Sequence, residues 1–139
     1  MSGVCWVKVG LAAGVALGVA WSSGAIARQV LREHLEEIPG VEVEGEAANG
    51  DEAVDRMMRL RPDVLLLDLQ MPGMDGFAVA RRLAGPSAPA IIYVTAYAQH
   101  ALKAFETGAV DYLLKPVRRE RLEVALGKAR RLTGAERPV

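Results

Sequence analysis

The sequence has few of the residues that build metal, disulfide or redox sites. Its 139 residues include one cysteine, Cys5, and two histidines, His34 and His100. One cysteine excludes an internal disulfide framework and a cysteine-based zinc site, and two scattered histidines do not supply a histidine-rich one. We predict that both histidines are solvated surface groups on helices. The low cysteine content suits a reducing, cytoplasmic compartment.

The sequence also lacks an excess of either charge. Seventeen basic and seventeen acidic residues balance, so no global charge favours a nucleic-acid partner. No glycine-rich phosphate loop of the dinucleotide or P-loop kind is present, which disfavours a flavin or nucleotide enzyme. The length suits one domain. The basic residues near the C-terminus are predicted to form a solvated helix face: Arg118, Arg119, Arg121, Arg130 and Arg131.

The first 27 residues lack carboxylates altogether, and no acidic residue lies between Met1 and Gln29. Three interpretations compete for this apolar segment. It could be a signal peptide with a small-residue cleavage site, or a weak membrane span rich in alanine and glycine. We favour the third, in which residues 15–21 form a first core strand and the preceding residues form a loose extension, because cleavage would remove a strand that the sheet needs.

Apolar runs and helical patterns alternate along the rest of the chain. Continuous or alternating apolar residues predict strands, and apolar residues repeating every three to five positions predict helices between them. Such an alternation indicates a parallel sheet covered on both faces. We therefore expect an α/β fold with five helices and five strands, the strands covering residues 15–21, 41–44, 64–68, 90–95 and 110–114.

Polar residues end three of these predicted strands: Asp68, Thr95 and Lys115. The carboxyl ends of parallel strands lie at one edge of a sheet, which is where open α/β sheets bind ligands. A carboxylate beside an ammonium group can act as an anchored nucleophile toward phosphorus. A hydroxyl and an ammonium nearby could hold phosphoryl oxygens.

Three motifs carry a family resemblance: LLDLQMPGMDG at residues 66–76, VTA at residues 94–96 and DYLLKP at residues 111–116. They resemble bacterial response-regulator receiver domains over about residues 15–131. The stretch TAYAQHALKAFE at residues 95–106 is similar to receivers of LytTR-type transcriptional regulators. The resemblance implies a flavodoxin-like (CheY-like) doubly wound parallel sheet with strand order 2-1-3-4-5.

The resemblance also implies residue roles. Asp68 would be the phosphoacceptor, with Thr95 and Tyr112 as the conformational switch. Lys115, Thr95 and Ala96 would bind the phosphoryl group. The peptide bond before Pro116 would be cis.

In this family an acidic pair after the first strand holds Mg²⁺, together with the phosphoacceptor and a backbone carbonyl. Here Asp68 and the Gln70 carbonyl remain as expected metal ligands, but Ser22 and Ser23 stand at the positions of the acidic pair. Two hydroxyls remove two formal charges from the cage, which weakens magnesium binding. Three explanations stay open: a natural atypical receiver, a misread start or frame, and a deliberate alteration.

From these patterns we expect residues 1–14 to be an extension, residues 15–131 a receiver domain and residues 132–139 a flexible tail. The domain would take a phosphoryl group from a histidine kinase and could catalyse its own phosphorylation and dephosphorylation without being a conventional enzyme. Its partners would be that kinase and a second copy, bound through the fourth helix, last strand and last helix. No membrane partner is expected, and DNA would be bound only through an effector domain absent from this chain. The alternative is a pseudo-receiver, a protein-interaction module independent of phosphorylation.

Overall fold

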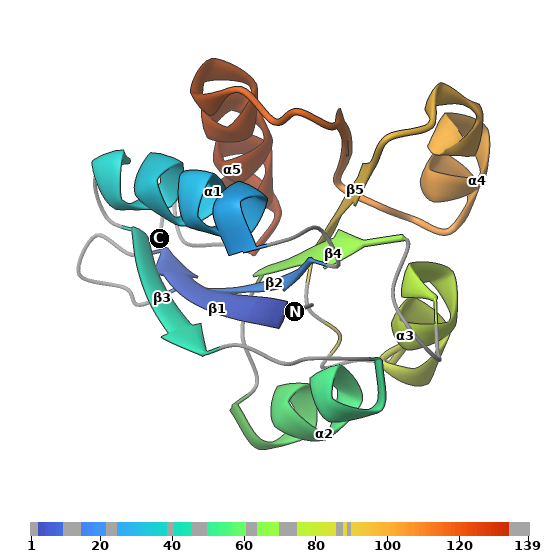
Figure 1. Cartoon of the computed structure of the whole chain (residues 1–139). Helices are drawn as coiled ribbons and strands as arrows, with labels where there is room; N and C mark the ends of the chain where they lie inside the picture. The colour runs from blue at the N-terminus through green and yellow to red at the C-terminus, as the bar shows by residue number, and fades with distance from the viewer. Residues whose placement is uncertain are drawn as a thin grey trace.

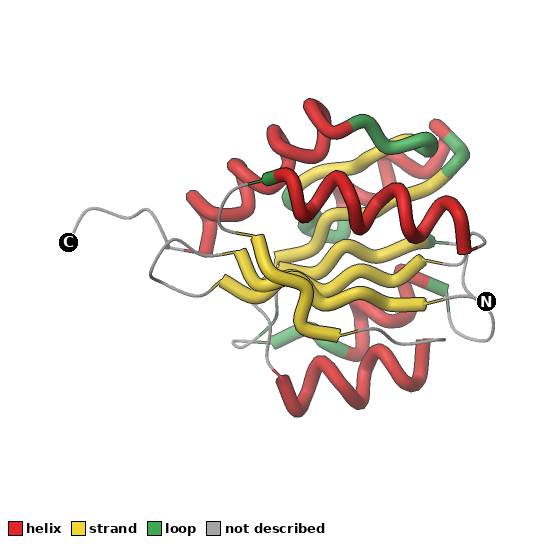
Figure 2. Tube along the Cα trace, turned by 60° about the vertical axis from the view of Figure 1, so that its left-hand side comes forward, coloured by secondary structure: helices red, strands yellow, loops and turns green. Residues whose placement is uncertain are grey.

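The strands of the molecule form one mixed sheet between two layers of helices (Figure 1, Figure 2). The computed structural model describes residues 3–9, 15–21, 25–38, 41–45, 50–60, 64–69, 75–85, 88 and 90–133. Within these residues the sheet has six strands: β1 (Gly3–Val9), β2 (Val15–Trp21), β3 (Val41–Gly45), β4 (Val64–Asp68), β5 (Ala90–Thr95) and β6 (Asp111–Leu114).

Five α-helices follow the predicted pattern. They are α1 (Ala25–Glu37), α2 (Gly50–Leu60), α3 (Gly76–Arg82), α4 (Ala101–Glu106) and α5 (Arg119–Thr133). A short 3-10 turn, η1 (Ala98–His100), leads into α4. Helices α1 and α5 lie on one face of the sheet, and α2 and α3 lie on the other (Figure 1). No helix in the described ranges has the length and apolar content needed to cross a bilayer.

The strand order is β3-β1-β2-β4-β5-β6, which differs from the prediction at one place. The five predicted strands keep their expected order along the sheet, and the predicted core strand at residues 15–21 is confirmed as β2. The expected direct pairing of the first two predicted strands is wrong, because β1 lies between them and pairs antiparallel with both β2 and β3. Residues 3–9 are therefore a strand and not a loose extension.

The pairing in β1 has a sequence basis. Three valines and a tryptophan occupy four of its seven positions, and such residues favour strands. Its seven residues pair with all seven of β2, from Gly3 opposite Trp21 to Val9 opposite Val15. An antiparallel pair of this kind needs only a short connection.

Alternating residues of the central strands build the two cores. Val64 and Leu66 of β4 pack with α1 and α5, whereas Leu65 and Leu67 pack with α2 and α3. All five residues of β4 are buried, as expected for a strand covered on both faces. The two layers thus fix β4 in place, and with it the position of Asp68 at its end.

Candidate functional site

Asp68 is the last residue of β4 and its side chain is completely buried. The Lys115 ammonium donates a hydrogen bond to the Asp68 carboxylate, with 2.6 Å between Nζ and Oδ2. The lysine side chain is 16% exposed, so the pair keeps some access to solvent through Lys115. Two charges this far out of water depend on each other, because either one alone would be poorly solvated.

The sheet register brings the neighbouring residues to the same edge. Asp68 lies opposite Val94, and Thr95 lies opposite Leu114, in parallel pairing. The Lys115 amide then donates to the Thr95 carbonyl at 2.8 Å, which extends the ladder by one residue. The Lys115–Pro116 peptide bond is cis, as the resemblance implies. Residues from β4, β5 and β6 therefore meet at the carboxyl ends of the strands, as the sequence predicts.

The Thr95 hydroxyl is buried and connects to the segment that follows β5. Its Oγ1 accepts a hydrogen bond from the Tyr97 amide at 3.2 Å and lies 3.2 Å from Nδ1 of His100. The Tyr112 hydroxyl donates to the Tyr97 carbonyl oxygen. The Tyr97 backbone thus joins Thr95 to Tyr112. Burial raises the pKa of Tyr112, so its hydroxyl stays a donor at neutral pH.

The start of α3 approaches the site closely. A Cβ atom at Gly76 would lie 2.8 Å from the Asp68 carbonyl oxygen and 3.0 Å from the Leu69 Cα. Only glycine lets the helix begin so near the end of β4. Asp75 caps this helix by accepting a hydrogen bond from the Ala78 amide at 2.8 Å.

The structure brings Asp68, Thr95, Tyr112 and Lys115 to one edge of the sheet, and Ala96 lies exposed directly after Thr95. Ser22, Ser23 and Gln70 lie outside the described residues. Both histidines differ from the prediction of solvated surface groups, and His34 is half-buried on α1. His100 is half-buried against Phe77 of α3 and close to Thr95. The burial of His100 could not be predicted from its polar neighbours in the sequence, because its packing partner Phe77 comes from a distant helix.

The described residues do not fit a magnesium cage. Octahedral magnesium takes several hard oxygen ligands, usually with one or two carboxylates. In the part of the chain that the structure describes, no three His, Cys, Asp or Glu side chains gather into a possible metal site. Asp68 and Lys115 already balance each other's charge, and no acidic residue precedes Glu33 in the sequence.

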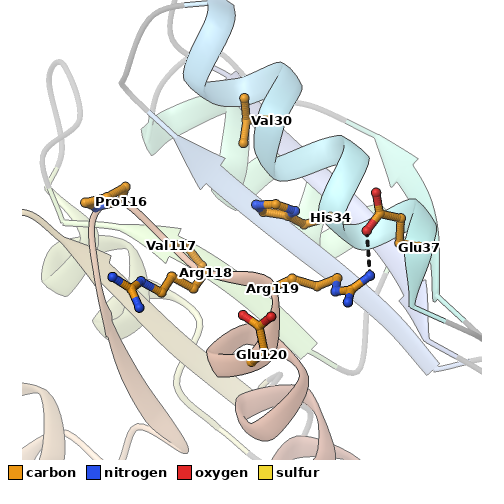
Figure 3. A pocket seen from close by; sticks show the side chains of 8 residues that line it. All are labelled: Val30, His34, Glu37, Pro116, Val117, Arg118, Arg119 and Glu120. Atoms are coloured by element: carbon orange, nitrogen blue, oxygen red, sulfur yellow. Dashed lines mark hydrogen bonds and ion pairs between the residues drawn. The ribbon is translucent and has the colours of Figure 1, made fainter.

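A groove of about 430 Å³ lies beside the site, between α1 and the segment that follows Lys115 (Figure 3). Val30 and His34 line it from α1, and Pro116 and Val117 line it from the other side. An ion pair between Arg119 and Glu37, with 2.8 Å between Nη1 and Oε2, crosses one end. Pro116, which lines the groove, directly follows the lysine that binds Asp68.

Known proteins resemble the chain in sequence. A family model described as the response regulator receiver domain matches residues 24–127, which begin after β2. The transcriptional regulatory protein BtsR of Escherichia coli is 43% identical over 105 residues, and the positive alginate biosynthesis regulatory protein of Pseudomonas aeruginosa is 47% identical over 108 residues. Each match covers 76% of this chain and 44% of the relative. The chain therefore spans less than half the length of these relatives.

Solved structures resemble it in fold. The response regulatory domain of mrkE from Klebsiella pneumoniae superposes with a TM-score of 0.73 at 27% identity, covering 81% of this chain and 93% of that one. Chemotaxis protein CheY4 of Vibrio cholerae gives a TM-score of 0.64 at 28% identity, covering 76% and 91% of the two chains. Both similarities extend across most of the solved domain.

Proposed function

The chain belongs to the response-regulator receiver family, and on that premise we propose that Asp68 accepts a phosphoryl group from a histidine kinase. The observation that carries the proposal is the buried Asp68–Lys115 pair at the sheet edge, with Thr95 on the strand between. Such a lysine holds the carboxylate in place before reaction and can hold a phosphoryl oxygen afterwards.

The transfer conserves atoms and electrons without any further reactant. An Asp68 carboxylate oxygen attacks the phosphorus of a phosphohistidine, the new P–O bond forms, and the P–N bond breaks. The imidazole nitrogen leaves with the bonding electron pair, and the product is an acyl phosphate. Lys115 then pairs with the phosphoryl oxygens, whose negative charge replaces that of the free carboxylate. The domain itself would then hydrolyse this acyl phosphate and return Asp68 to its free carboxylate.

Thr95 and Tyr112 form the proposed switch. A phosphoryl group on Asp68 favours the arrangement in which both side chains are drawn toward the site. Tyr97 connects the two through its amide and carbonyl, so a shift at Thr95 is passed to Tyr112 and the start of α4. Binding of the phosphoryl group would act by population shift, because it contributes free energy to one arrangement only.

Two surfaces suit the partners of such a domain. The groove beside Lys115 would receive the kinase, because a donor phosphohistidine must reach Asp68 from that edge. Exposed apolar side chains on α4 and β6 would join two copies: Leu102, Phe105 and Leu114. DNA binding, as in transcriptional regulators, would need a further domain, and the work of the chain would be cytoplasmic, where the kinase delivers its phosphoryl group.

A second candidate function is a phosphorylation-independent interaction module. It is favoured by the lack of acidic residues before Glu33 and by the described residues, which form no carboxylate cluster beside Asp68. In this form Asp68 and Lys115 would serve as a structural ion pair. The two functions differ in whether Asp68 ever carries phosphate.

The test is incubation with acetyl phosphate, in magnesium chloride and separately in EDTA, followed by intact mass measurement. We expect a gain of one phosphoryl group that is lost in hydroxylamine, is absent in the Asp68→Asn variant and depends only weakly on magnesium. The Asp75→Asn variant, altered at a carboxylate that caps α3, should be labelled like the wild type. No label in either buffer would reject the phosphoacceptor and support the interaction module.

A further inference from the structure

His100 occupies a defined place between the switch threonine and α3. Its Nδ1 lies 3.2 Å from the Thr95 Oγ1. Its ring meets Phe77 edge-on, with centroids 6.3 Å apart, and meets Tyr97 in the same manner at 5.9 Å. Two aromatic contacts fix the plane of the imidazole, so Nδ1 faces the hydroxyl with little freedom to turn away.

The chemistry of this contact has two forms. A hydroxyl has one proton to donate and two lone pairs, and imidazole Nδ1 either donates or accepts. The Tyr97 amide already donates to the hydroxyl oxygen. A protonated Nδ1 donates to the same oxygen, so the hydroxyl proton is not drawn toward His100. An unprotonated Nδ1 accepts that proton and turns it toward α4.

We propose that His100 is a positioning residue that directs the Thr95 hydroxyl proton and thereby sets the lifetime of a phosphoryl group on Asp68. The proposal rests on the proposed function, in which Asp68 takes that group and Thr95 holds one of its oxygens. When His100 donates, the Thr95 proton can be directed at the phosphoryl oxygen. When His100 accepts, it competes with the phosphoryl group for the same proton.

The protonation of His100 would respond to the charges around it. Lys103 on α4 places its ammonium 4.6 Å from the centre of the Phe77 ring, the same ring that His100 contacts. The α3 helix also carries Arg81 and Arg82, and Asp75 caps its start. Beyond Thr95 lie the Asp68–Lys115 pair and, on β6, Tyr112.

The decisive experiment measures the decay of phosphorylated protein from pH 5.5 to 7.5 in the full chain and its variants. His100→Phe keeps an aromatic ring against Phe77 and Tyr97 but removes both nitrogens. The ratio of wild-type to His100→Phe lifetime should rise by about threefold to tenfold toward low pH, the range expected for one hydrogen bond. His100→Asn, which places a non-titrating amide near the Nδ1 position, should show the same pH profile as His100→Phe.

Met58→Phe supplies the control, since it adds an aromatic ring at an exposed position of α2 that lines neither the site nor the groove. Met58→Phe should decay like the wild type at every pH. A His100→Phe profile that matches the wild type across the range would overturn the proposal, as would an equal effect of Met58→Phe.

A second measurement keeps this proposal distinct from the proposed function. If the wild type takes no phosphoryl group, the phosphoacceptor fails, and the proton sharing is then tested by ¹⁵N NMR of the imidazoles. Thr95→Val should change the Nδ1 chemical shift of His100 and leave that of His34 unchanged. Identical His100 Nδ1 chemical shifts in the wild type and Thr95→Val would overturn the proposal without reference to phosphate.

Discussion

Lys115 binds Asp68 across an intervening strand. Lys115 follows β6, Asp68 ends β4, and β5 lies between these two strands. The 2.6 Å contact therefore ties together three strands at their carboxyl ends. It is both the centre of the proposed phosphoryl site and a part of the fold, because neither charge has full access to water.

Replacing Lys115 by Met should destabilise the protein by about 3 kcal/mol, because it leaves a buried carboxylate without its cation. Urea denaturation followed by circular dichroism measures the change in the free energy of unfolding. The double variant Asp68→Asn with Lys115→Met should regain part of that loss, since no unpaired charge remains. A double variant as unstable as the sum of the single ones would show that the two residues do not interact.

Two glycines should respond to alanine in opposite ways. Gly76→Ala forces a methyl group to within 2.8 Å of a backbone oxygen, so we expect a loss of about 1–3 kcal/mol. Gly127 in α5 has open space, with only the Arg131 Nη1 at 3.8 Å, so Gly127→Ala should stabilise the helix by about 1 kcal/mol. Thermal unfolding of both variants tests this, and a neutral Gly76→Ala would contradict the close approach of α3 to β4.

The ionisation of Asp111 makes the free energy of unfolding depend on pH. Burial raises the pKa of this carboxyl, but hydrogen bonds from Arg121 and the charge of Lys128 outweigh burial and hold the pKa below its usual range. A carboxyl whose folded pKa is lowered stabilises the fold above its unfolded pKa, and that stability is lost as the pH falls toward the folded value. The stability difference between wild type and Asp111→Asn should therefore be constant near neutrality and shrink below about pH 4.

The magnitude of this difference is limited by solvent. Arg121 is 44% exposed, so the pair should contribute about 1 kcal/mol near pH 7 and less at high salt. Urea unfolding at a series of pH values provides the measurement. A difference that grows as the pH falls would reverse the sign and refute the assignment.

Kinase docking in the groove predicts a selective defect. Val30 lines the groove and is 43% exposed, so Val30→Glu should leave the fold intact while placing a charge in the docking surface. We expect phosphoryl transfer from the phosphorylated kinase to slow at least tenfold, a loss of about 1.4 kcal/mol, with labelling by acetyl phosphate unchanged. Val124→Glu on α5 alters a valine that is also exposed, at 53%, and lies outside the groove, so this variant should accept the phosphoryl group normally. Equal rates for the two variants would place the kinase elsewhere.

Self-association should depend on the apolar surface of α4. Phe105 is exposed at the end of that helix, and an aspartate there would put a charge into an interface that excludes water. Sedimentation of the phosphorylated chain should show a dimer that Phe105→Asp dissociates. A dimer that persists in this variant would require another contact surface.

The apolar runs predicted five strands and the edge where the site residues meet, because burial on both faces leaves a strong pattern in the sequence. They did not predict the pairing of β1. Its valines satisfy strand propensity with any neighbour. The five residues between Val9 and Val15 include Gly10 and Gly14, which are typical of a longer hairpin connection but do not say which other strand pairs with β1. Position in a sheet depends on which edges remain available after the other strands have paired.

The candidate site was likewise predicted from the sequence only in part. The motifs predicted that Asp68, Thr95 and Lys115 would meet at one edge of the sheet, and the structure brings them together there. They did not identify the contacts of His100, because its environment depends on the distance between η1 and α3 and on Phe77, which lies 23 positions earlier in the chain (100 − 77 = 23). Packing between helices has no local signature of this kind.

The antiparallel pairing of β1 with β2 also bears on how the chain reaches its native state. A parallel ladder forms only after a crossover of a dozen or more residues has closed, which costs chain entropy before any strand contact is made. Here Val9 and Val15 pair across five residues, so the first ladder of the sheet is local. Local contacts form fastest, and this hairpin can assemble and offer a template edge before the crossover through α1, β3 and α2 brings β4 alongside β2.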